Sequence, residues 1–330
     1  MDSVSQIALG AAVSVAAMGR RTALWKAAAW GAVCGTLPDL DVLVDHGDAL
    51  ANMVMHRGDS HALFWLSLAA LPLGAAIAAL QRESALLWRW VLTAWLALVT
   101  HPLLDAMTIY GTQLLRPFST EPLGLGSVFI IDPLYTLPLL IGTGIALRGK
   151  ASALRWNAAG LLLSCAYLGW SALAQQQVLQ TARASLQGEP RVERLMATPA
   201  PFNTLLWRVV AITPDSYLEG YHSLIAPGQP LRFTRHERGA ALYETLRAHP
   251  PVATLAAFSH GFFKLERTDR GEILMADLRM GQEPDYFFRF VVAREQSPLQ
   301  LLDHPEAAGS RPEPGAALRQ LWRRLWGESV

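Results

Sequence analysis

The stretch that decides the fold of the first half of this chain is residues 62–80, which read ALFWLSLAALPLGAAIAAL. It contains no charged residue, and its length approaches the roughly 20 apolar residues that a helix needs to cross a bilayer. Directly before it, residues 56–61 read His-Arg-Gly-Asp-Ser-His. The sequence therefore predicts an apolar helix that begins directly after a group of imidazole and charged side chains. Apolar segments with polar groups at their ends recur in the surrounding sequence.

Other apolar segments on both sides of this stretch predict further helices. Together the segments are 4–18, 22–37, 62–80, 85–101, 133–147 and 153–174. The third, fourth and sixth approach the length of a membrane span, whereas the first two are short and contain Gly10, Gly31 and Gly35, which favour close helix packing. The pattern predicts an α-helical membrane domain of about five to six apolar helices over residues 1–175.

Basic residues indicate how these helices are oriented. They gather in the loops between the first and second, third and fourth, and fifth and sixth segments, at Arg20, Arg21, Lys26, Arg82, Arg89, Arg148, Lys150 and Arg155. If the helices alternate across the bilayer, these loops share one side, which the positive-inside rule makes cytoplasmic. We therefore expect a multi-pass protein of a bacterial inner (plasma) membrane, with the motif loops and the C-terminal domain extracytoplasmic.

The rest of the chain reads as an ordinary soluble sequence. Residues 176–200 are a polar connector, and residues 201–330 alternate short apolar and polar runs between Gly and Pro residues. The expected strands are 206–212, 217–224, 262–267, 273–278 and 286–292, and the expected helices are 239–247 and 316–326. These elements predict a small α+β soluble domain after the membrane domain.

Composition agrees with a membrane protein and argues against a nucleic-acid-binding one. Of the 330 residues, 52% are hydrophobic and only 17% are charged, compared with about 25% charged in a typical soluble domain. The net charge is +1 and the arginines are scattered along the chain. No basic surface for nucleic acid is therefore expected.

Ligand-type side chains gather at the ends of the apolar helices, although hydrocarbon penalises such groups. Each motif alone has an ordinary alternative, such as a helix cap, a solvated loop or a pair of surface histidines. Together they come from one expected face, at Asp39, Asp41, His56, His61, His101 and Asp105. Six nitrogen and oxygen donors suit one octahedral divalent ion or two ions about 3.5–4 Å apart, and without a cysteine among them a thiolate zinc site is excluded. The pairing of His101 with Asp105 is the least secure, because Pro102 predicts a bend in their helix.

Other polar residues near these donors point to an anionic substrate. The expected substrate-binding residues are Arg57, Arg116, Thr108 and Gln113, and the candidates for a catalytic base or an outer ligand partner are Asp59, Asp45 and His46. Arginine pairs well with phosphate oxygens. A metal beside an arginine predicts phosphoester hydrolysis, because both stabilise the charge that develops on the phosphoryl oxygens.

Several blocks of the sequence also carry a family resemblance. They are residues 1–4 with Gln6 and Gly10, 35–41, 56–61, 100–108, 110–114, 116–119 and 131–136, with weaker blocks at 201–207, 220–224 and 277–281. On these blocks the chain resembles the YdjM-like family, described as LexA-binding, inner-membrane-associated, metal-dependent hydrolases. The strong part of the resemblance covers about the first 150 residues.

The resemblance implies a membrane-bound hydrolase with a loose similarity to zinc phospholipase C sites. It favours zinc, with magnesium or manganese as alternatives, bound as one or two ions. Many members carry Thr-His near the N-terminus, where this chain has Ser5-Gln6. Gln6 removes that imidazole from the expected ligands, although its amide can still hydrogen-bond a ligand or a water.

These observations predict an enzyme: a membrane-bound, divalent-metal-dependent hydrolase of a phosphoester or lipid-linked substrate at the membrane surface. Two alternatives use the same residues, a metal or ion transport protein and a structural membrane protein whose metal tethers its loops. Transporters usually bind ions near the middle of the bilayer, whereas these residues lie at helix ends. The expected partners are the lipid bilayer and a lipid substrate; the substrate, the number of ions and the oligomeric state stay open.

Overall fold

The structure is a computed structural model that describes residues 1–149, 153–189, 191–226, 228–310 and 313–328. The chain forms two compact units. The first comprises Met1–Val44, His56–Ala172 and Pro201–Asn203. The second comprises Asp45–Met55, Leu173–Ala200 and Thr204–Val330, so a short piece of the N-terminal half belongs to it.

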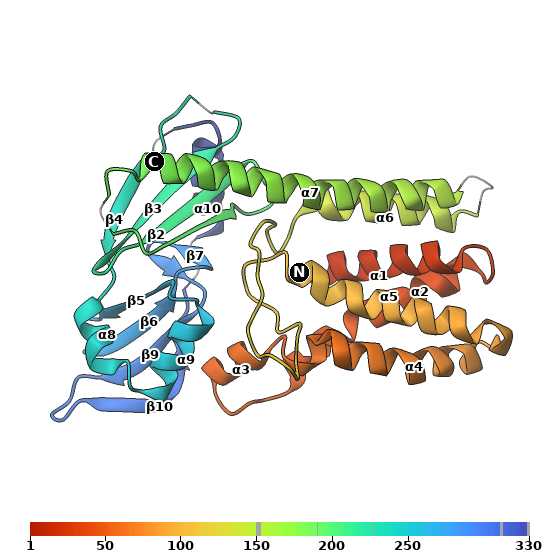
Figure 1. The fold of residues 1–330 in the computed structure, drawn as a ribbon, viewed down its shortest axis with the longest axis horizontal. Helices are drawn as coiled ribbons and strands as arrows, with labels where there is room; N and C mark the ends of the chain where they lie inside the picture. Colours follow the sequence, from red (N-terminus) through yellow and green to blue (C-terminus); the bar gives the residue numbers. More distant parts are fainter. Residues whose placement is uncertain (150–152, 190, 227, 311–312, 329–330) are drawn as a thin grey trace. The chain divides into compact units, whose positions relative to one another are not determined.

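The first unit is a group of apolar helices joined by short turns. Its helices are α1 (Ser3–Met18), α2 (Leu24–Thr36), α4 (Leu63–Leu80), α5 (Leu87–Asp105), α6 (Pro133–Leu147) and the first part of α7 (Ala153–Ser185), with 3₁₀ turns η1 (Pro38–Leu43), η2 (Asp59–His61) and η3 (Ser84–Leu86). Helices α1, α2, α4 and α5 lie side by side (Figure 1). Their shared core is fully buried and includes Val15, Ile77 and Trp90.

Helices α1 and α2 cross at glycines, as the sequence predicts. A Cβ atom added to Gly10 would lie 2.2 Å from the carbonyl oxygen of Gly31, and one added to Gly35 would lie 2.7 Å from that of Gln6. No larger side chain fits at such distances, so the two backbones touch. This contact holds the end of α2, and the η1 turn that follows it, against the start of α1.

The expected count of five to six membrane helices is wrong. Within the described residues, two helical stretches are long and apolar enough to cross a membrane, Leu63–Leu80 and Leu154–Ser185. Helices α1, α2 and α6 have 16, 13 and 15 residues, which at about 1.5 Å per residue fall short of a hydrocarbon core of about 30 Å. Helix α5 has 19 residues but carries Arg89, His101 and Asp105, which lower its hydropathy. Lys150, one of the basic residues behind the expected topology, lies outside the described residues.

The second unit is built on two four-stranded antiparallel sheets. The first sheet has the order β1 (Arg194–Pro199), β2 (Leu206–Ile212), β3 (Ser216–Ser223) and β4 (Phe233–Glu237); the second has the order β10 (Gln300–Ala307), β9 (Arg289–Arg294), β6 (Glu272–Asp277) and β5 (Phe263–Arg267). A short pair, β7 (Gly281–Gln282) and β8 (Asp285–Tyr286), stands beside them. Buried Ile212, Tyr217 and Leu278 belong to one core that both sheets share.

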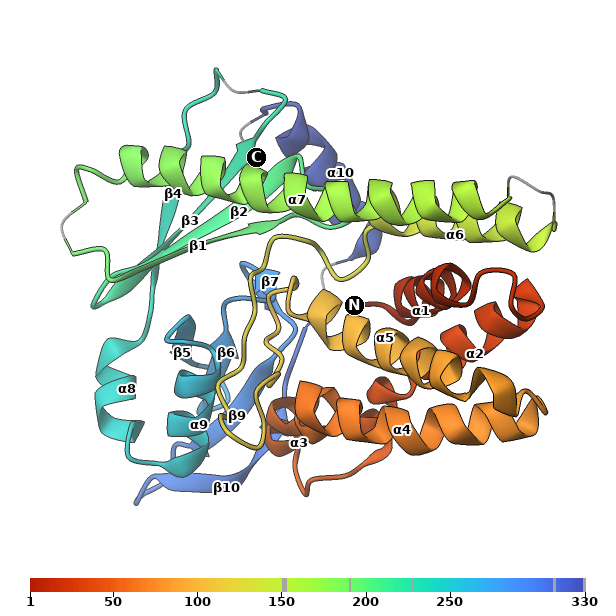
Figure 2. The ribbon, with the colours of Figure 1, turned by 45° about the vertical axis from the view of Figure 1, so that its right-hand side comes forward.

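Helices cover these sheets within the unit. They are α3 (Ala49–Met55), α8 (Ala240–Leu246), α9 (Pro250–Phe258), α10 (Pro314–Leu325) and the second part of α7. Helix α7 packs Val178 and Ala182 against Trp207 of β2. Helices α8 and α9 lie against the second sheet, and α10 lies against β2 and β3 (Figure 2).

Some elements of this unit were not expected from the sequence. Strand β4 lies mostly exposed, so it lacks the alternation of apolar residues that marks a half-buried strand. Strand β10 contains Pro305 next to a break in its register with β9. Helix α9 begins at Pro250-Pro251, which reads as a turn but suits the first helical positions, where no N–H is needed.

Candidate metal centre

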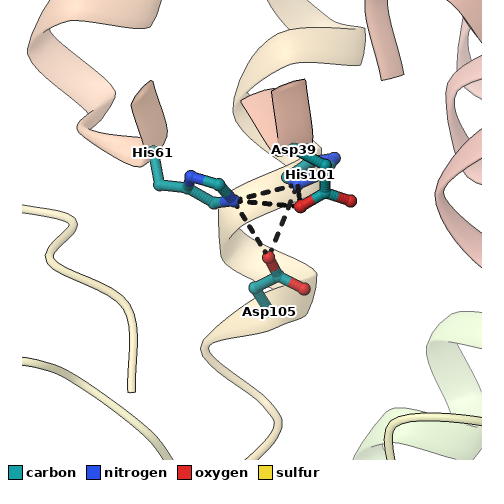
Figure 3. Close-up of side chains that lie close together, drawn as sticks. All are labelled: Asp39, His61, His101 and Asp105. Atoms are coloured by element: carbon teal, nitrogen blue, oxygen red, sulfur yellow. Dashed lines mark hydrogen bonds and ion pairs between the residues drawn. The ribbon is translucent and has the colours of Figure 1, made fainter. Parts of the chain in front are cut away.

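Four ligand-type side chains converge in the first unit, from three elements that are far apart in the sequence. Asp39 comes from η1, His61 from η2, and His101 and Asp105 from the last turns of α5 (Figure 3). Each offers one donor atom, and all four atoms lie within 4.8 Å of one another. Three of the four residues are buried and Asp39 is partly exposed, so the cluster is reached from the side of Asp39.

The pairing of His101 with Asp105 survives the proline between them. Helix α5 continues through Pro102 to Asp105, so the two side chains face the same side one turn apart. His101 Nε2 lies 3.4 Å from Asp105 Oδ2. The bend expected at Pro102 does not separate them.

Hydrogen bonds to the outer nitrogens orient both imidazoles. His101 Nδ1 lies 2.6 Å from the carbonyl oxygen of Gly35, which can only accept, so Nδ1 carries the proton. The Ser60 hydroxyl donates to Asp41 at 2.6 Å and lies 2.8 Å from His61 Nδ1, so it accepts from that nitrogen. In the neutral rings, both Nε2 atoms therefore present lone pairs to each other across 3.2 Å. This is how outer partners fix the tautomer of metal-bound histidines.

The distances between donor atoms test whether an ion fits. His61 Nε2 lies 3.4 Å from Asp39 Oδ1 and 3.3 Å from Asp105 Oδ2. His101 Nε2 lies 3.3 Å from Asp39 Oδ1. A tetrahedral ion with bonds of about 2.0–2.1 Å has donor atoms about 3.3–3.4 Å apart. The distances that involve an imidazole nitrogen are therefore those around a zinc-sized ion, and the two carboxylate oxygens lie within 4.8 Å of each other. Asp105 Oδ2, which faces this space, is buried and has no hydrogen-bond partner within the part of the chain that the structure describes.

Close packing of these groups shifts their pKa values. Burial lowers the pKa of His61, but hydrogen bonds with Asp105, Asp39 and Asp41 outweigh it and raise that pKa to about 9. Burial raises the pKa of Asp39, yet hydrogen bonds from His101 and His61 bring it well below its usual range. The cluster thus attracts positive charge strongly, and in the absence of an ion protons supply that charge.

Asp41 and His56, expected as ligands, form a separate pair next to the cluster. Asp41 Oδ1 lies 2.8 Å from His56 Nδ1, and Oδ2 accepts a hydrogen bond from Arg57 N at 3.0 Å. The 3₁₀ geometry of η1 explains the separation from Asp39, because residues two apart on a helix of about three residues per turn point in different directions. Asp41 reaches His61 through Ser60, so it supports the cluster from outside.

Two of the expected substrate-binding residues lie directly beside the cluster. Arg57 is buried, its Nε lies 3.3 Å from Asp105 Oδ2, and its Nη1 donates to Thr108 Oγ1 at 3.2 Å. The backbone of Arg57 has φ of 65°, an uncommon value that aims the side chain inward after the turn. A fixed positive charge therefore stands next to the four donors.

The other two expected substrate-binding residues pair with Asp59 instead. Arg116 Nε lies 2.9 Å from Asp59 Oδ1, and Arg116 Nη1 donates to Gln113 Oε1 at 3.0 Å. The side chain of Asp59 is 58% exposed, so this group can meet solvent or a substrate. Its role in catalysis or binding stays a prediction.

Asp45 and His46, the remaining expected catalytic residues, belong to the second unit. Asp45 Oδ1 accepts hydrogen bonds from Gly47 N and Asn52 Nδ2, both at 3.0 Å. The backbone N–H of His46 donates to Asn52 Oδ1 at 2.6 Å. These contacts order their own loop, and a role for either residue as a base stays a prediction.

Asp105 has one neighbour that sequence reasoning missed, Met1, and one that it expected, Gln6. The N-terminal amine of Met1 forms an ion pair with Asp105 Oδ1. Gln6 Nε2 donates to the same oxygen at 3.1 Å and to the carbonyl oxygen of His101 at 3.2 Å. The substitution at Gln6 was a usable signal, since an amide there was expected to hydrogen-bond a ligand. The contact of Met1 had no signal in the sequence.

The fold and the cluster define a class: membrane-associated helical proteins with a buried histidine–aspartate group able to hold a metal. The family described as "YdjM inner membrane protein" matches residues 1–178. That is more than half of the chain, and the chain belongs to this family.

A relative supports the same assignment. The Bacillus subtilis (strain 168) "Uncharacterized protein YfhP" is 25% identical over 187 residues, which are 56% of this chain and 54% of that protein. The match therefore spans about half the length of the relative. No solved structure matches this chain significantly.

Proposed function

We propose that this protein is a membrane-bound, metal-dependent hydrolase of a phosphoester or lipid-linked substrate. The observation that carries the proposal is the cluster of Asp39, His61, His101 and Asp105, whose imidazole Nε2 atoms both face the carboxylates. A buried arginine stands beside it, 3.3 Å from Asp105. Metal ligands with an adjacent fixed cation are the parts that phosphoryl-transfer sites share.

The donor set favours zinc as the ion. Two imidazole nitrogens together with two carboxylate oxygens suit zinc, whereas magnesium prefers six oxygen ligands and keeps several waters. When bound, such an ion polarises a phosphoryl oxygen and lowers the pKa of a water. Asp39, His61, His101 and Asp105 would hold it. Manganese or magnesium is an outcome that metal analysis distinguishes.

The residues around the ligands have separate tasks in this proposal. Gly35 and Ser60 hold the imidazoles through their outer nitrogens, so the rings cannot turn away. Arg57 balances the charge of Asp105 and, once an ion takes over that task, can bind an anionic oxygen of the substrate. The exposed group of Asp59 and Arg116 would bind the rest of the substrate.

Exposed apolar residues beside the ligands favour a lipid-linked substrate. In η1, Asp39 and Asp41 are partly buried, while Leu40, Val42 and Leu43 are 52%, 71% and 80% exposed. One short turn thus carries a ligand on one side and an apolar surface on the other. A substrate with a phosphate head and an acyl tail matches both surfaces, and its membrane would cover the exposed side chains.

Protein purified in detergent tests the proposal by metal content and by hydrolysis of a chromogenic phosphodiester and of a phospholipid. Asp39→Asn, which keeps the shape of the side chain, is expected to remove the ion and the activity together. Asp303→Asn, an exposed carboxylate of β10 in the second unit, is the matched control and should retain both. Full metal loading without turnover of any phosphoester would contradict the hydrolase.

The two alternatives give different results in the same preparation. An ion transport protein would carry the loaded metal across liposomes, and the flux would depend on the same ligands. A structural metal would lower the thermal stability on chelation and support neither flux nor hydrolysis.

A further inference from the structure

Helix α10 presents an unusual face to solvent. Leu318 and Trp322 of the helix and Trp326, the residue directly after it, have exposed fractions of 53%, 63% and 58%. The two indole rings meet edge to face, with centroids 5.8 Å apart. Large apolar side chains three and four residues apart form one stripe on a helix, so this stripe lies open along the length of α10.

The side of α10 that packs on the second unit is mixed, with Leu321 and Leu325 partly buried beside polar residues. Gln320 Oε1 accepts a hydrogen bond from Gln282 at 3.1 Å, and Arg324 donates to Gln282 Oε1 at 3.0 Å. The guanidinium of Arg324 also lies over the ring of Tyr221, 3.7 Å from its centroid. A surface helix of a soluble domain normally buries its apolar stripe and exposes its polar side. This helix buries only part of its apolar face in the unit, so the exposed stripe requires another explanation.

Two arginines lie at the edge of the stripe. Arg319 and Arg323 are both exposed and one turn apart, and Arg323 Nε pairs with exposed Glu328 at 2.6 Å. Arginine next to tryptophan and leucine on an amphipathic helix is the pattern of helices that lie in the headgroup layer of a membrane. Tryptophan concentrates at that layer, and phosphates there complement arginine. The family is described as an inner membrane protein, so a bilayer is an available partner for this helix.

We propose that α10 docks on the surface of a phospholipid bilayer. Leu318, Trp322 and Trp326 enter the interfacial layer, and Arg319 and Arg323 contact lipid phosphates. The family match ends at residue 178, so this contact belongs to the part of the chain beyond it. It gives the second unit its own membrane contact, independent of any metal in the first unit.

Spin-label depth measurement on the full chain in nanodiscs tests this proposal. A nitroxide at Leu318→Cys, in a Cys165→Ser background, leaves both tryptophans in place, and Cys34 is buried and does not react. A label at Ala241→Cys, on exposed α8 of the same unit, is the control. Oxygen concentrates in the bilayer, whereas a water-soluble nickel complex stays outside it. The label at position 318 is expected to collide severalfold more with oxygen than with the nickel complex, and the label at position 241 severalfold more with the nickel complex.

Charge reversal separates docking from chance exposure. Arg319→Glu with Arg323→Glu should lower the ratio of docked to undocked helix roughly fivefold for each arginine when the nanodisc contains phosphatidylglycerol. Arg247→Glu, at the residue directly after α8, should leave that ratio unchanged. Thermal melting of each variant checks that the second unit stays folded.

Two results would overturn the proposal. Equal water access at positions 318 and 241 would mean that the stripe faces solvent. Shielding of position 318 from both reagents, with dipolar broadening between labels, would mean that a second copy of the chain covers the stripe instead of lipid.

Discussion

Each unit of this protein buries a group of charged side chains, and the two groups differ in how they are satisfied. In the second unit, Arg208 Nε donates to Glu219 at 2.5 Å and its Nη1 donates to the carbonyl oxygen of Leu278 at 2.7 Å. Lys264 Nζ lies 2.8 Å from both Glu283 and Glu266. Both cations of this group, Arg208 and Lys264, meet a carboxylate, so their charges are balanced within the group.

The cluster of Asp39, His61, His101 and Asp105 in the first unit is arranged differently. Both imidazoles are held through their outer nitrogens and turn their Nε2 atoms toward the carboxylates, and Asp105 Oδ2 lies 3.3 Å from Arg57 Nε but forms no hydrogen bond of good geometry within the described chain. Burying such groups costs several kcal/mol when they stay unpaired. The comparison teaches that buried charge alone does not mark a functional site. Donor atoms of two imidazoles and two carboxylates that converge on one point do.

Removing one imidazole of the cluster should have the largest effect. His61→Ala takes away a direct donor, so its loss of metal affinity should exceed the 10- to 100-fold loss typical of an outer partner. Titration calorimetry with zinc measures the loss. His249→Ala, which removes a buried imidazole from the second unit, should bind zinc as the wild type does. Equal affinity of His61→Ala and wild type would place the ion elsewhere.

Breaking the ion pair between Arg208 and Glu219 in the second unit should lower the free energy of unfolding and leave the metal content unchanged. Glu219→Ala leaves Arg208 buried without its carboxylate, which costs about 3–5 kcal/mol of unfolding free energy. Exchanging both residues for methionine restores a neutral core and should recover most of that loss. Thermal unfolding of the chelated protein gives these values. A loss of bound zinc in Glu219→Ala, with the first unit still folded, would show that the two groups are not separate.

An outer partner of the cluster should matter less than a ligand. Ser60→Ala removes the hydroxyl that holds His61 Nδ1, so the ring is free to turn, and zinc affinity should fall about tenfold. Ser67→Ala is the matched control, because Ser67 bonds within α4 and to Trp95. An unchanged affinity in Ser60→Ala would mean that packing alone orients the ring.

The pH dependence of binding should be gradual, and it changes no side chain. The pKa of His61 is raised to about 9 without metal, so protons compete with zinc below that pH. Apparent affinity should rise with pH between 6 and 8.5, by up to about tenfold per unit for each proton released. For the metal-free protein the sign is opposite: this group stabilises the fold fully below its ordinary pKa, and that contribution is lost as pH rises through about 9. Affinity independent of pH would contradict a ligand role for His61.

Much of the helical half could be predicted from the sequence, because long apolar runs and their polar ends are local signals. Helix α6 begins and ends where the run at 133–147 does, and α1 and α4 differ from their runs by one residue at the start. The number of helices that cross the membrane could not be predicted from these local signals. Apolar content predicted helices, while crossing a bilayer also requires length, which α2 lacks.

The sequence predicted which residues belong to the site, but not how those residues are arranged in space. The motifs named all four residues of the cluster, since imidazoles and carboxylates stand out in an apolar chain. Two backbone conformations decide which of the six expected ligands come together. The 3₁₀ turn η1 points Asp41 away from Asp39, and helix α5 continues through Pro102. Neither backbone conformation follows from residue types. The role of Ser60 in holding His61 also depends on η1, because that turn places Asp41 where the Ser60 hydroxyl donates to it.

Anomalous X-ray scattering at the zinc edge, on crystals of the wild-type protein, tests the central claim most directly. The account predicts one peak between Asp39, His61, His101 and Asp105, about 2.0–2.1 Å from their donor atoms. It also predicts that the peak is absent in His61→Ala. A folded wild-type protein with no peak there after loading, or a peak bound by other residues, would contradict it.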